Sequence, residues 1–150
     1  MATQHEPVGA TDPLTEVQAV YAALAGRPIE RDCIRRAECC QFQVTGRTPY
    51  LTRGEALLAA KALRATGRTK LPAPEHNGCP LLDGKTGRCL IYENRPFGCR
   101  THFCRAAGGP YARSEVRDLI RRLEAVDVRL TGTGAVSLPV ALELALREAN

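Results

Sequence analysis

The stretch CPLLDGKTGRCLIYENRPFGCRTHFC, residues 79–104, places four cysteines within twenty-six positions. Thiols this close in sequence are typical of a disulfide framework, a metal site, or cysteines that pack as small apolar side chains. Turn residues accompany them, at Asp83-Gly84, at Gly87 and at Asn94-Arg95-Pro96, and residues 89–92 predict a short strand between these turns. A backbone with so many turns can bend around a small centre.

The full set of cysteines favours a metal over disulfides. All seven lie in one part of the chain and are candidate ligands: Cys33, Cys39, Cys40, Cys79, Cys89, Cys99 and Cys104. An odd number disfavours a complete disulfide framework. The first residues lack the pattern of a secretory signal, and no apolar run is long enough to span a membrane, so we expect a cytosolic protein with reduced thiols and no membrane partner.

The spacing of the cysteines, C-x5-CC and then C-x9-C-x9-C-x4-C, excludes two common patterns. There is no CxxC pair as in a zinc ribbon, and no CxxCxxCxxxCP run as in a bacterial ferredoxin. Ligation by sulfur alone suits both tetrahedral zinc and iron–sulfur clusters. Seven thiols exceed the four of a single site, so the choice of ligands and the number of sites stay open.

Five separate blocks carry a family resemblance: CIRRAECC (33–40), YLTRGE (50–55), CPLLD (79–83), CLIYENRP (89–96) and CRTHFC (99–104). In this order they resemble the YkgJ-like cysteine-cluster family, named for its CxxCxxCC motif. The resemblance implies a domain that chelates zinc or iron through these cysteines. One position departs from the motif, because Arg36 stands where the family has its second cysteine. One potential ligand is thereby lost.

Other residues near the cysteines have weaker claims to a role. His102 is a candidate nitrogen ligand, although a solvated histidine is the favoured interpretation, and more so for His76. Asp83 indicates a turn and not a ligand. Arginines beside the cysteines could donate N–H···S hydrogen bonds or simply be surface charge, and both interpretations stay open: Arg36, Arg95 and Arg100.

The net charge of +5 comes from eighteen arginines and three lysines against sixteen acidic residues. Excess positive charge can indicate nucleic-acid binding. Here the arginines are scattered, with Arg35-Arg36 and Arg121-Arg122 as the only adjacent pairs, which favours a solvated surface. We therefore expect no nucleic-acid partner, and the sequence indicates no particular protein partner.

Helical signals flank the cysteine-rich centre. Asp12-Pro13 predicts the start of a helix that ends at Gly26, and Thr52 with Glu55 forms a capping box for a helix that ends near Gly67. Apolar residues at helical spacing predict further helices over 111–130 and 138–148. Residues 41–51 predict an extended or hairpin segment around Gly46.

These elements predict a mostly α fold with small irregular or β-hairpin elements, compact and organised around a cysteine-rich metal site. We expect a disordered tail at 1–11 and one metal-binding domain at 12–150, with a cysteine core at 33–104 and C-terminal helices within 111–148.

The leading functional hypothesis is a cytosolic metal-binding protein that holds zinc or an iron–sulfur cluster. Two alternatives are an iron–sulfur-dependent redox enzyme or accessory protein, and a zinc-stabilised interaction module. The sequence has no nucleophile elbow, phosphate loop or paired carboxylates, so no residue is assigned a catalytic role, although a Cys–His pair with His102 is conceivable.

Overall fold

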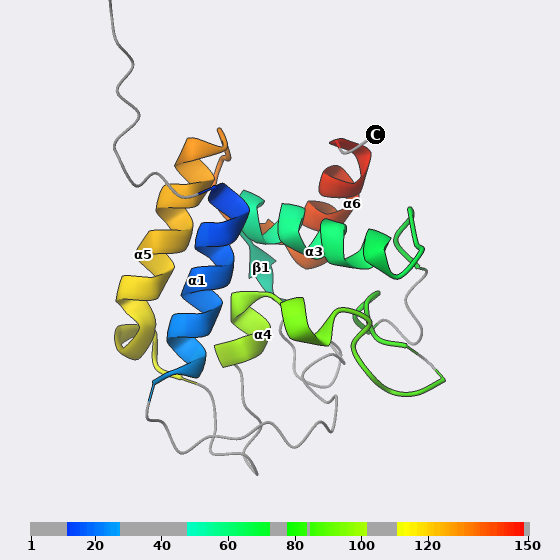
Figure 1. Cartoon of the computed structure of the whole chain (residues 1–150), viewed down its shortest axis with the longest axis horizontal. Coiled ribbons are helices and arrows are strands. Elements are labelled where there is room, and N and C mark those ends of the chain that lie inside the picture. Colours follow the sequence, from blue (N-terminus) through cyan, green and yellow to red (C-terminus); the bar gives the residue numbers. More distant parts are fainter. Residues whose placement is uncertain (1–11, 28–47, 73–77, 84, 102–110, 149–150) are drawn as a thin grey trace, which may run out of the picture.

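The computed structural model describes residues 12–27, 48–72, 78–83, 85–101 and 111–148 (Figure 1). Its elements, in chain order, are α1 (Pro13–Ala25), β1 (Tyr50–Leu51), α3 (Arg53–Ala65), η3 (Tyr92–Asn94), α4 (Phe97–Thr101), α5 (Arg113–Arg129), β2 (Val136–Ser137) and α6 (Leu138–Glu148). Helices α1 and α5 lie side by side, and α3 packs against both of them and against α6. The expected mostly helical, compact fold with small β elements is confirmed for these residues.

Helix α1 begins as the sequence predicts. The Asp12 carboxylate accepts a hydrogen bond from the Thr15 backbone N–H at 3.2 Å, and Pro13 occupies the first helical position. Such a cap satisfies a backbone donor that the helix itself leaves without an acceptor. The buried face consists of Val17, Val20, Tyr21 and Leu24, and it packs on α5 and α3.

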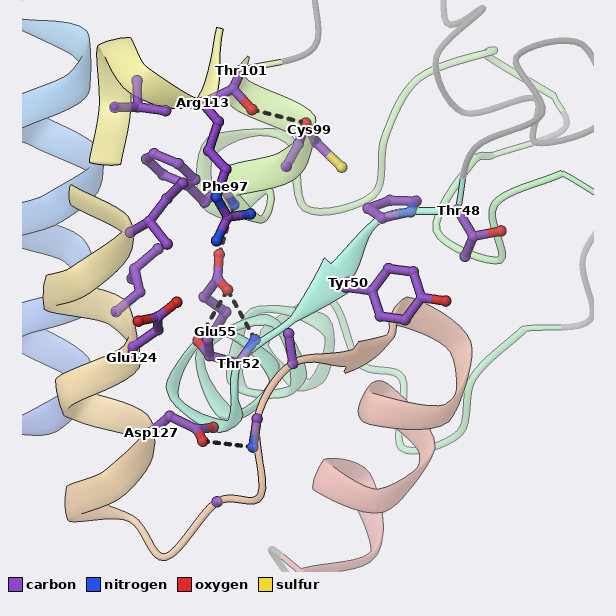
Figure 2. Close-up of a pocket in the computed structure, with 18 of the residues that line it drawn as sticks. Thr48, Tyr50, Thr52, Glu55, Phe97, Cys99, Thr101, Arg113, Glu124 and Asp127 are labelled. Atoms are coloured by element: carbon purple, nitrogen blue, oxygen red, sulfur yellow. Dashed lines mark hydrogen bonds between the residues drawn. The ribbon is translucent and has the colours of Figure 1, made fainter. Parts of the chain in front are cut away.

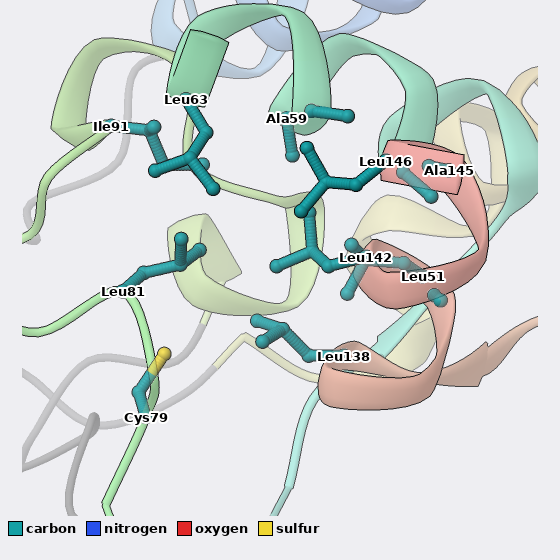
Figure 3. Close-up of a cluster of buried hydrophobic side chains, with 13 residues drawn as sticks. Leu51, Ala59, Leu63, Cys79, Leu81, Ile91, Leu138, Leu142, Ala145 and Leu146 are labelled. Carbon is teal, nitrogen blue, oxygen red and sulfur yellow. The ribbon is translucent and has the colours of Figure 1, made fainter. Parts of the chain in front are cut away.

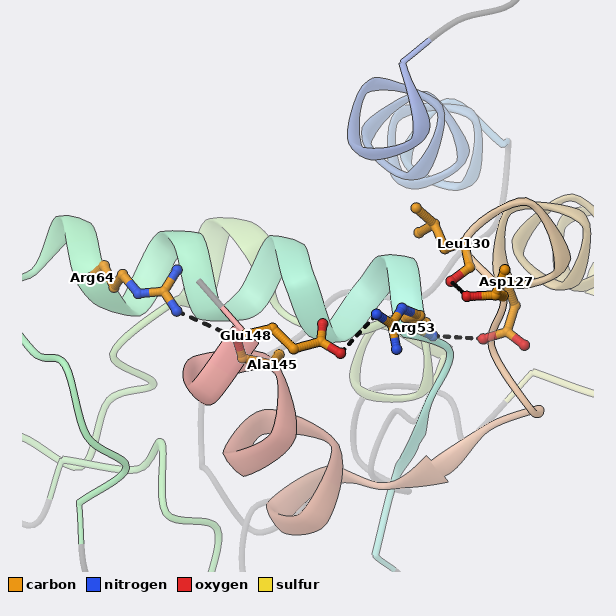
Figure 4. Close-up of polar contacts among 7 residues, drawn as sticks. Arg53, Arg64, Asp127, Leu130, Ala145 and Glu148 are labelled. Atoms are coloured by element: carbon orange, nitrogen blue, oxygen red, sulfur yellow. Dashed lines mark hydrogen bonds and ion pairs between the residues drawn. The ribbon is translucent and has the colours of Figure 1, made fainter. Parts of the chain in front are cut away.

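Helix α3 begins with the predicted capping box. Glu55 accepts hydrogen bonds from the Thr52 backbone N–H and hydroxyl, both at 3.0 Å. At the other end of the helix, Arg64 donates to the carbonyls of Ala145 and Leu146 near the end of α6 (Figure 4). Carbonyls in the last turn of a helix lack partners within the helix, so this arginine both caps α6 and holds it against α3.

The small sheet joins distant parts of the chain. Strand β1 pairs antiparallel with β2, with Tyr50 opposite Ser137 and Leu51 opposite Val136. The Leu138 N–H also donates to the Pro49 carbonyl at 2.9 Å. The segment predicted as extended or hairpin at 41–51 is extended at Tyr50 and Leu51, where it pairs with residues that directly precede α6. Residues 41–47 lie outside the described residues.

Two hydrophobic clusters share helix α3. The first lies between α3 and α6 and includes Leu51, Leu63, Leu81, Leu138 and Leu142 (Figure 3). The second lies among α1, α3 and α5, and includes Val17, Leu58, Leu119 and Phe97. Leucine, alanine and valine predominate, and each fully buried leucine or valine contributes about 1.5–3 kcal/mol. Because α3 contributes to both clusters, it connects the two halves of the molecule.

The start of α3 also approaches α5 closely. A Cβ atom on Gly54 would lie 2.8 Å from Val126 and 2.9 Å from Val17, so only glycine fits where the three helices meet. Beside it, the buried Asp127 accepts a hydrogen bond from the Arg53 N–H at 2.8 Å (Figure 4). It accepts another from the Gly134 N–H at 3.0 Å. Asp127 therefore ties the start of α3 to Gly134, in the segment that joins α5 to β2.

The predicted strand at 89–92 is wrong. Cys89 forms a single antiparallel bridge with Leu82, and the chain then enters the short 3-10 helix η3. The helix α4 was not predicted, because its five residues contain a glycine and no helical periodicity can be recognised over so short a length.

None of the helices in the described segments is long and apolar enough to cross a membrane. The expected tail at 1–11 lies outside those segments.

Candidate metal centre

Cys79 and Cys89 lie on one loop that closes on the first hydrophobic cluster. The Leu82 N–H donates to the Cys79 carbonyl at 3.0 Å, and Leu82 pairs with Cys89 across the isolated bridge. Cys79 is buried at the edge of the cluster near Leu81 and Leu138 (Figure 3), and Cys89 is half-buried. Both side chains are thiols. Packing against a rigid core holds this loop in place.

The turn within this loop confirms the interpretation of Asp83. Its carboxylate accepts hydrogen bonds from the Lys85 N–H at 3.1 Å and from the Thr86 hydroxyl at 2.9 Å. These bonds, that of Lys85 foremost, lower the pKa of Asp83. The carboxylate therefore shapes the turn between the two cysteines.

Cys99, the third thiol in the described residues, lies on α4. It is half-buried, and in Figure 2 its sulfur points away from α5. Cys99 lines a cavity of about 950 Å³ between α4, α5 and β1, together with Tyr50, Glu55 and Phe97. Cys99 therefore lies at the edge of this cavity, and its helix packs on the core.

A buried carboxylate holds α4 in place. The Phe97 N–H donates to Glu55 Oε1 at 2.8 Å (Figure 2). The Tyr21 hydroxyl donates to the same oxygen at 3.2 Å. With the two bonds from Thr52, Glu55 accepts four hydrogen bonds at 3% exposure. Burial raises the pKa of Glu55, and these hydrogen bonds oppose the rise.

The arginines that flank the cysteines contact rings and carbonyls. The Arg100 guanidinium stacks on the Tyr21 ring, 4.1 Å from its centroid, and donates to the carbonyls of Arg95 and Glu93. The Arg95 guanidinium stacks on the Tyr92 ring at 4.1 Å. Both arginines therefore stabilise the chain between η3 and α4. The two interpretations offered from the sequence, surface charge and N–H···S hydrogen bonding, did not include this role. Arg36 lies outside the described residues.

Cys99 interacts electrostatically with Tyr21 and Arg100. Burial first, and then the Glu55 carboxylate, raise the pKa of Tyr21 well above its usual value, and Cys99 acts in the same direction. Burial lowers the pKa of Arg100, whereas Cys99 favours its charged form. A thiolate at position 99 would therefore have a cation as its neighbour on α4.

The structure leaves the complete set of ligands untested. Four of the seven predicted cysteines, and both histidines weighed beside them, lie outside the described residues: Cys33, Cys39, Cys40, Cys104, His76 and His102. Within the described ranges, no three His, Cys, Asp or Glu side chains form a group that could hold a metal ion. The donor chemistry nevertheless fits zinc or iron, since each described candidate is a thiol.

Sequence reasoning identified Glu55 as a cap but missed its second role. The capping box predicts its bonds to Thr52, which is three residues away. Its bonds to Tyr21 and Phe97 span 34 and 42 residues. A glutamate inside the resembling YLTRGE block, directly before the apolar run that begins at Ala56, was the available signal.

Comparison with known proteins adds one finding. A family model named CxxCxxCC and described as a "Putative zinc- or iron-chelating domain" matches residues 32–118. The match spans more than half of the 150 residues and contains all seven cysteines. It extends beyond the resembling blocks into α5. Searches of curated proteins and of solved structures gave no significant match.

Proposed function

The chain belongs to the CxxCxxCC family, and from this membership we propose that its cysteine thiolates hold zinc or an iron–sulfur cluster. The observation that carries the proposal is the position of the family match, which contains every cysteine of the chain. Thiolates are soft donors that select zinc and iron–sulfur clusters over magnesium or calcium. The family description supports metal binding in general, and the identity of the metal is part of the proposal.

The described thiols come from two rigid supports. Cys79 and Cys89 come from a loop packed on the α3–α6 cluster, and Cys99 comes from a helix bound to Glu55. A metal site with donors on rigid supports loses less entropy on binding than one with donors on open loops. We propose that further cysteines from the segments around residues 33–40 and 104 complete the ligand set.

The bound group would act as a crosslink or as an electron carrier. Zinc supplies a closed tetrahedral site that stabilises the fold, and an iron–sulfur cluster supplies a one-electron redox centre. Cysteines must be reduced to bind either zinc or an iron–sulfur cluster, so we propose that the protein resides in a reducing compartment, the cytosol. Because Arg36 replaces the second cysteine of the motif, seven cysteines remain as candidate donors.

Elemental analysis together with an absorption spectrum tests this proposal. The protein should be purified without oxygen and without added metal. We expect zinc or iron in stoichiometric amount, with a visible chromophore if the metal is iron. A matched preparation in which Cys99 and Cys89 are changed to serine should contain less metal than the wild type. Protein that contains neither metal would contradict the proposal.

A further inference from the structure

Helix α4 is too short to form alone. It has five residues, whereas isolated helices shorter than about 12–15 residues are marginal in water. Contacts with the rest of the fold must therefore set both its position and the direction of the Cys99 side chain. Three such contacts are evident: the buried Phe97 ring, the Phe97 N–H, and the Arg100 guanidinium.

Two of these contacts lead to Glu55. The Phe97 N–H donates directly to Glu55 Oε1. Arg100, next to Cys99, stacks on the ring of Tyr21, and the Tyr21 hydroxyl donates to the same oxygen. The carboxylate therefore restrains α4 directly at its first residue and, through Tyr21, at the residue that follows the cysteine.

We propose that Glu55 is a positioning residue for the metal centre: it fixes α4, and with it the direction of the Cys99 thiolate, before a metal binds. This inference rests on the proposed function, because it takes Cys99 as a ligand. Neighbouring groups that orient metal ligands commonly matter about 10- to 100-fold in metal affinity. Glu55 would act less directly than such a group, because it contacts the backbone of α4 and not the Cys99 side chain.

The isosteric change Glu55→Gln tests the idea sharply. Oε1 faces the Phe97 N–H, and Oε2 faces the Thr52 N–H. A glutamine must direct its NH₂ group at one of these two donors, and a backbone N–H cannot accept a hydrogen bond. The substitution therefore keeps the side-chain volume and removes one bond at a helix start.

The chain offers a matched control at Glu115. It holds the equivalent position in α5, and its carboxylate accepts a hydrogen bond from the Ala112 N–H at 2.7 Å in an exposed setting. Glu115→Gln changes the same group at the start of a helix that carries none of the seven cysteines. Tyr21→Phe is a milder second variant, because it removes only the hydroxyl bond to Glu55 and keeps the ring under Arg100.

The test uses Co²⁺ as the probe on the full-length, reduced and metal-free protein. Thiolate ligation gives Co²⁺ an intense charge-transfer band, whose intensity reports the number of bound thiolates. We expect Glu55→Gln to weaken Co²⁺ binding about tenfold and to lower the band toward that of Cys99→Ser. Tyr21→Phe should show a smaller effect, and Glu115→Gln should match the wild type.

A second readout needs no metal. Alkylation of Cys99, measured by peptide mass spectrometry on folded metal-free protein, should become about tenfold faster in Glu55→Gln because α4 opens more often. Alkylation of Cys89, on the other support, should keep its wild-type rate. A core variant of similar stability, Leu142→Ala, should leave the Cys99 rate unchanged, which distinguishes positioning from general destabilisation.

The two proposals fail in different ways. Wild-type Co²⁺ binding and alkylation in both Glu55→Gln and Glu55→Ala, with a reduced band in Cys99→Ser, would overturn the positioning role and leave metal binding intact. Glu55→Ala is needed because it removes the acceptor of the Phe97 N–H whichever way a glutamine amide turns. A full band in Cys99→Ser would show that Cys99 is not a ligand and would also overturn it. Wild-type protein that binds neither Co²⁺ nor zinc would contradict the proposed function itself.

Discussion

The Phe97 backbone N–H donates a 2.8 Å hydrogen bond to the Glu55 carboxylate across 42 residues of sequence. The same carboxylate caps α3 through Thr52. Two helix starts therefore share one buried carboxyl group, and the second of these helices carries Cys99. This arrangement connects the hydrophobic core with a candidate metal ligand and motivates the first two predictions.

Removal of the Glu55 carboxylate should destabilise the fold substantially. Glu55→Ala leaves the Phe97 N–H and the Tyr21 hydroxyl buried without their acceptor. We expect a loss of about 3 kcal/mol in the free energy of unfolding, because each such group costs about 1–3 kcal/mol. Urea denaturation of metal-free protein measures this loss. Glu115→Ala, the exposed equivalent, should cost less than about 1 kcal/mol, and equal losses in the two variants would argue against the assigned network.

The raised pKa of Glu55 predicts a dependence of stability on pH. A carboxyl whose pKa rises on folding binds its proton more tightly in the folded state, so acid favours folding at this site. The contribution is complete below the ordinary value of 4.5 and is lost as the pH rises through the raised folded value. The unfolding free energy of the wild type relative to Glu55→Gln should therefore increase as the pH falls from 7.

Comparison with Glu55→Gln isolates this carboxyl. The pKa values of Asp83 and Asp118 are lowered in the folded protein, so their contributions weaken in acid, but both groups are present in both proteins and cancel. Urea unfolding at several pH values provides the measurement. A difference between the two proteins that stays constant or shrinks on acidification would mean that the Glu55 pKa is not raised.

Gly54→Ala should disrupt the junction of three helices. The new methyl group would lie 2.8 Å from Val126 and 2.9 Å from Val17. Overpacking of this kind costs about 1–3 kcal/mol, more than the gain of about 1 kcal/mol in helix propensity. Gly26→Ala is the control, because its methyl group would have ordinary contacts at 3.6 and 3.7 Å. Thermal unfolding should show a lower midpoint for Gly54→Ala only.

Metal removal should lower the melting temperature. A group that binds only the folded state stabilises it by mass action, and structural thiolate sites supply much of the folding energy in small domains. We expect a chelator to lower the midpoint by at least about 3 °C, which corresponds to about 1 kcal/mol in a domain of this size. Addition of the metal should restore it. An unchanged midpoint after proven metal loss would exclude a stabilising role.

Local signals in the sequence predicted the long helices well. Asp12 and Pro13 begin α1, Thr52 and Glu55 begin α3, and the apolar spacing predicted α5 and α6. Each of these signals involves residues within one or two turns of each other. Helix starts and amphipathic faces depend on such short-range chemistry, so a single sequence can reveal them.

Relationships between distant residues could not be predicted. The pairing of Leu51 with Val136 and the bond from Phe97 to Glu55 depend on how the helices pack. The predicted strand at 89–92 failed because its β-favouring residues meet a single bridging partner, Leu82, before the chain turns into η3. Sequence clustering predicted the candidate ligands as a set, whereas the three described thiols lie on two different supports.

X-ray absorption at the edge of the bound metal tests the central claim most directly. If cysteine thiolates hold the metal, the nearest shell should contain about four sulfur atoms at about 2.3 Å. A matched Cys99→Ser sample should show fewer sulfurs or less metal. A nearest shell of oxygen and nitrogen atoms alone, or metal-free protein whose cysteines are oxidised in pairs, would contradict the account.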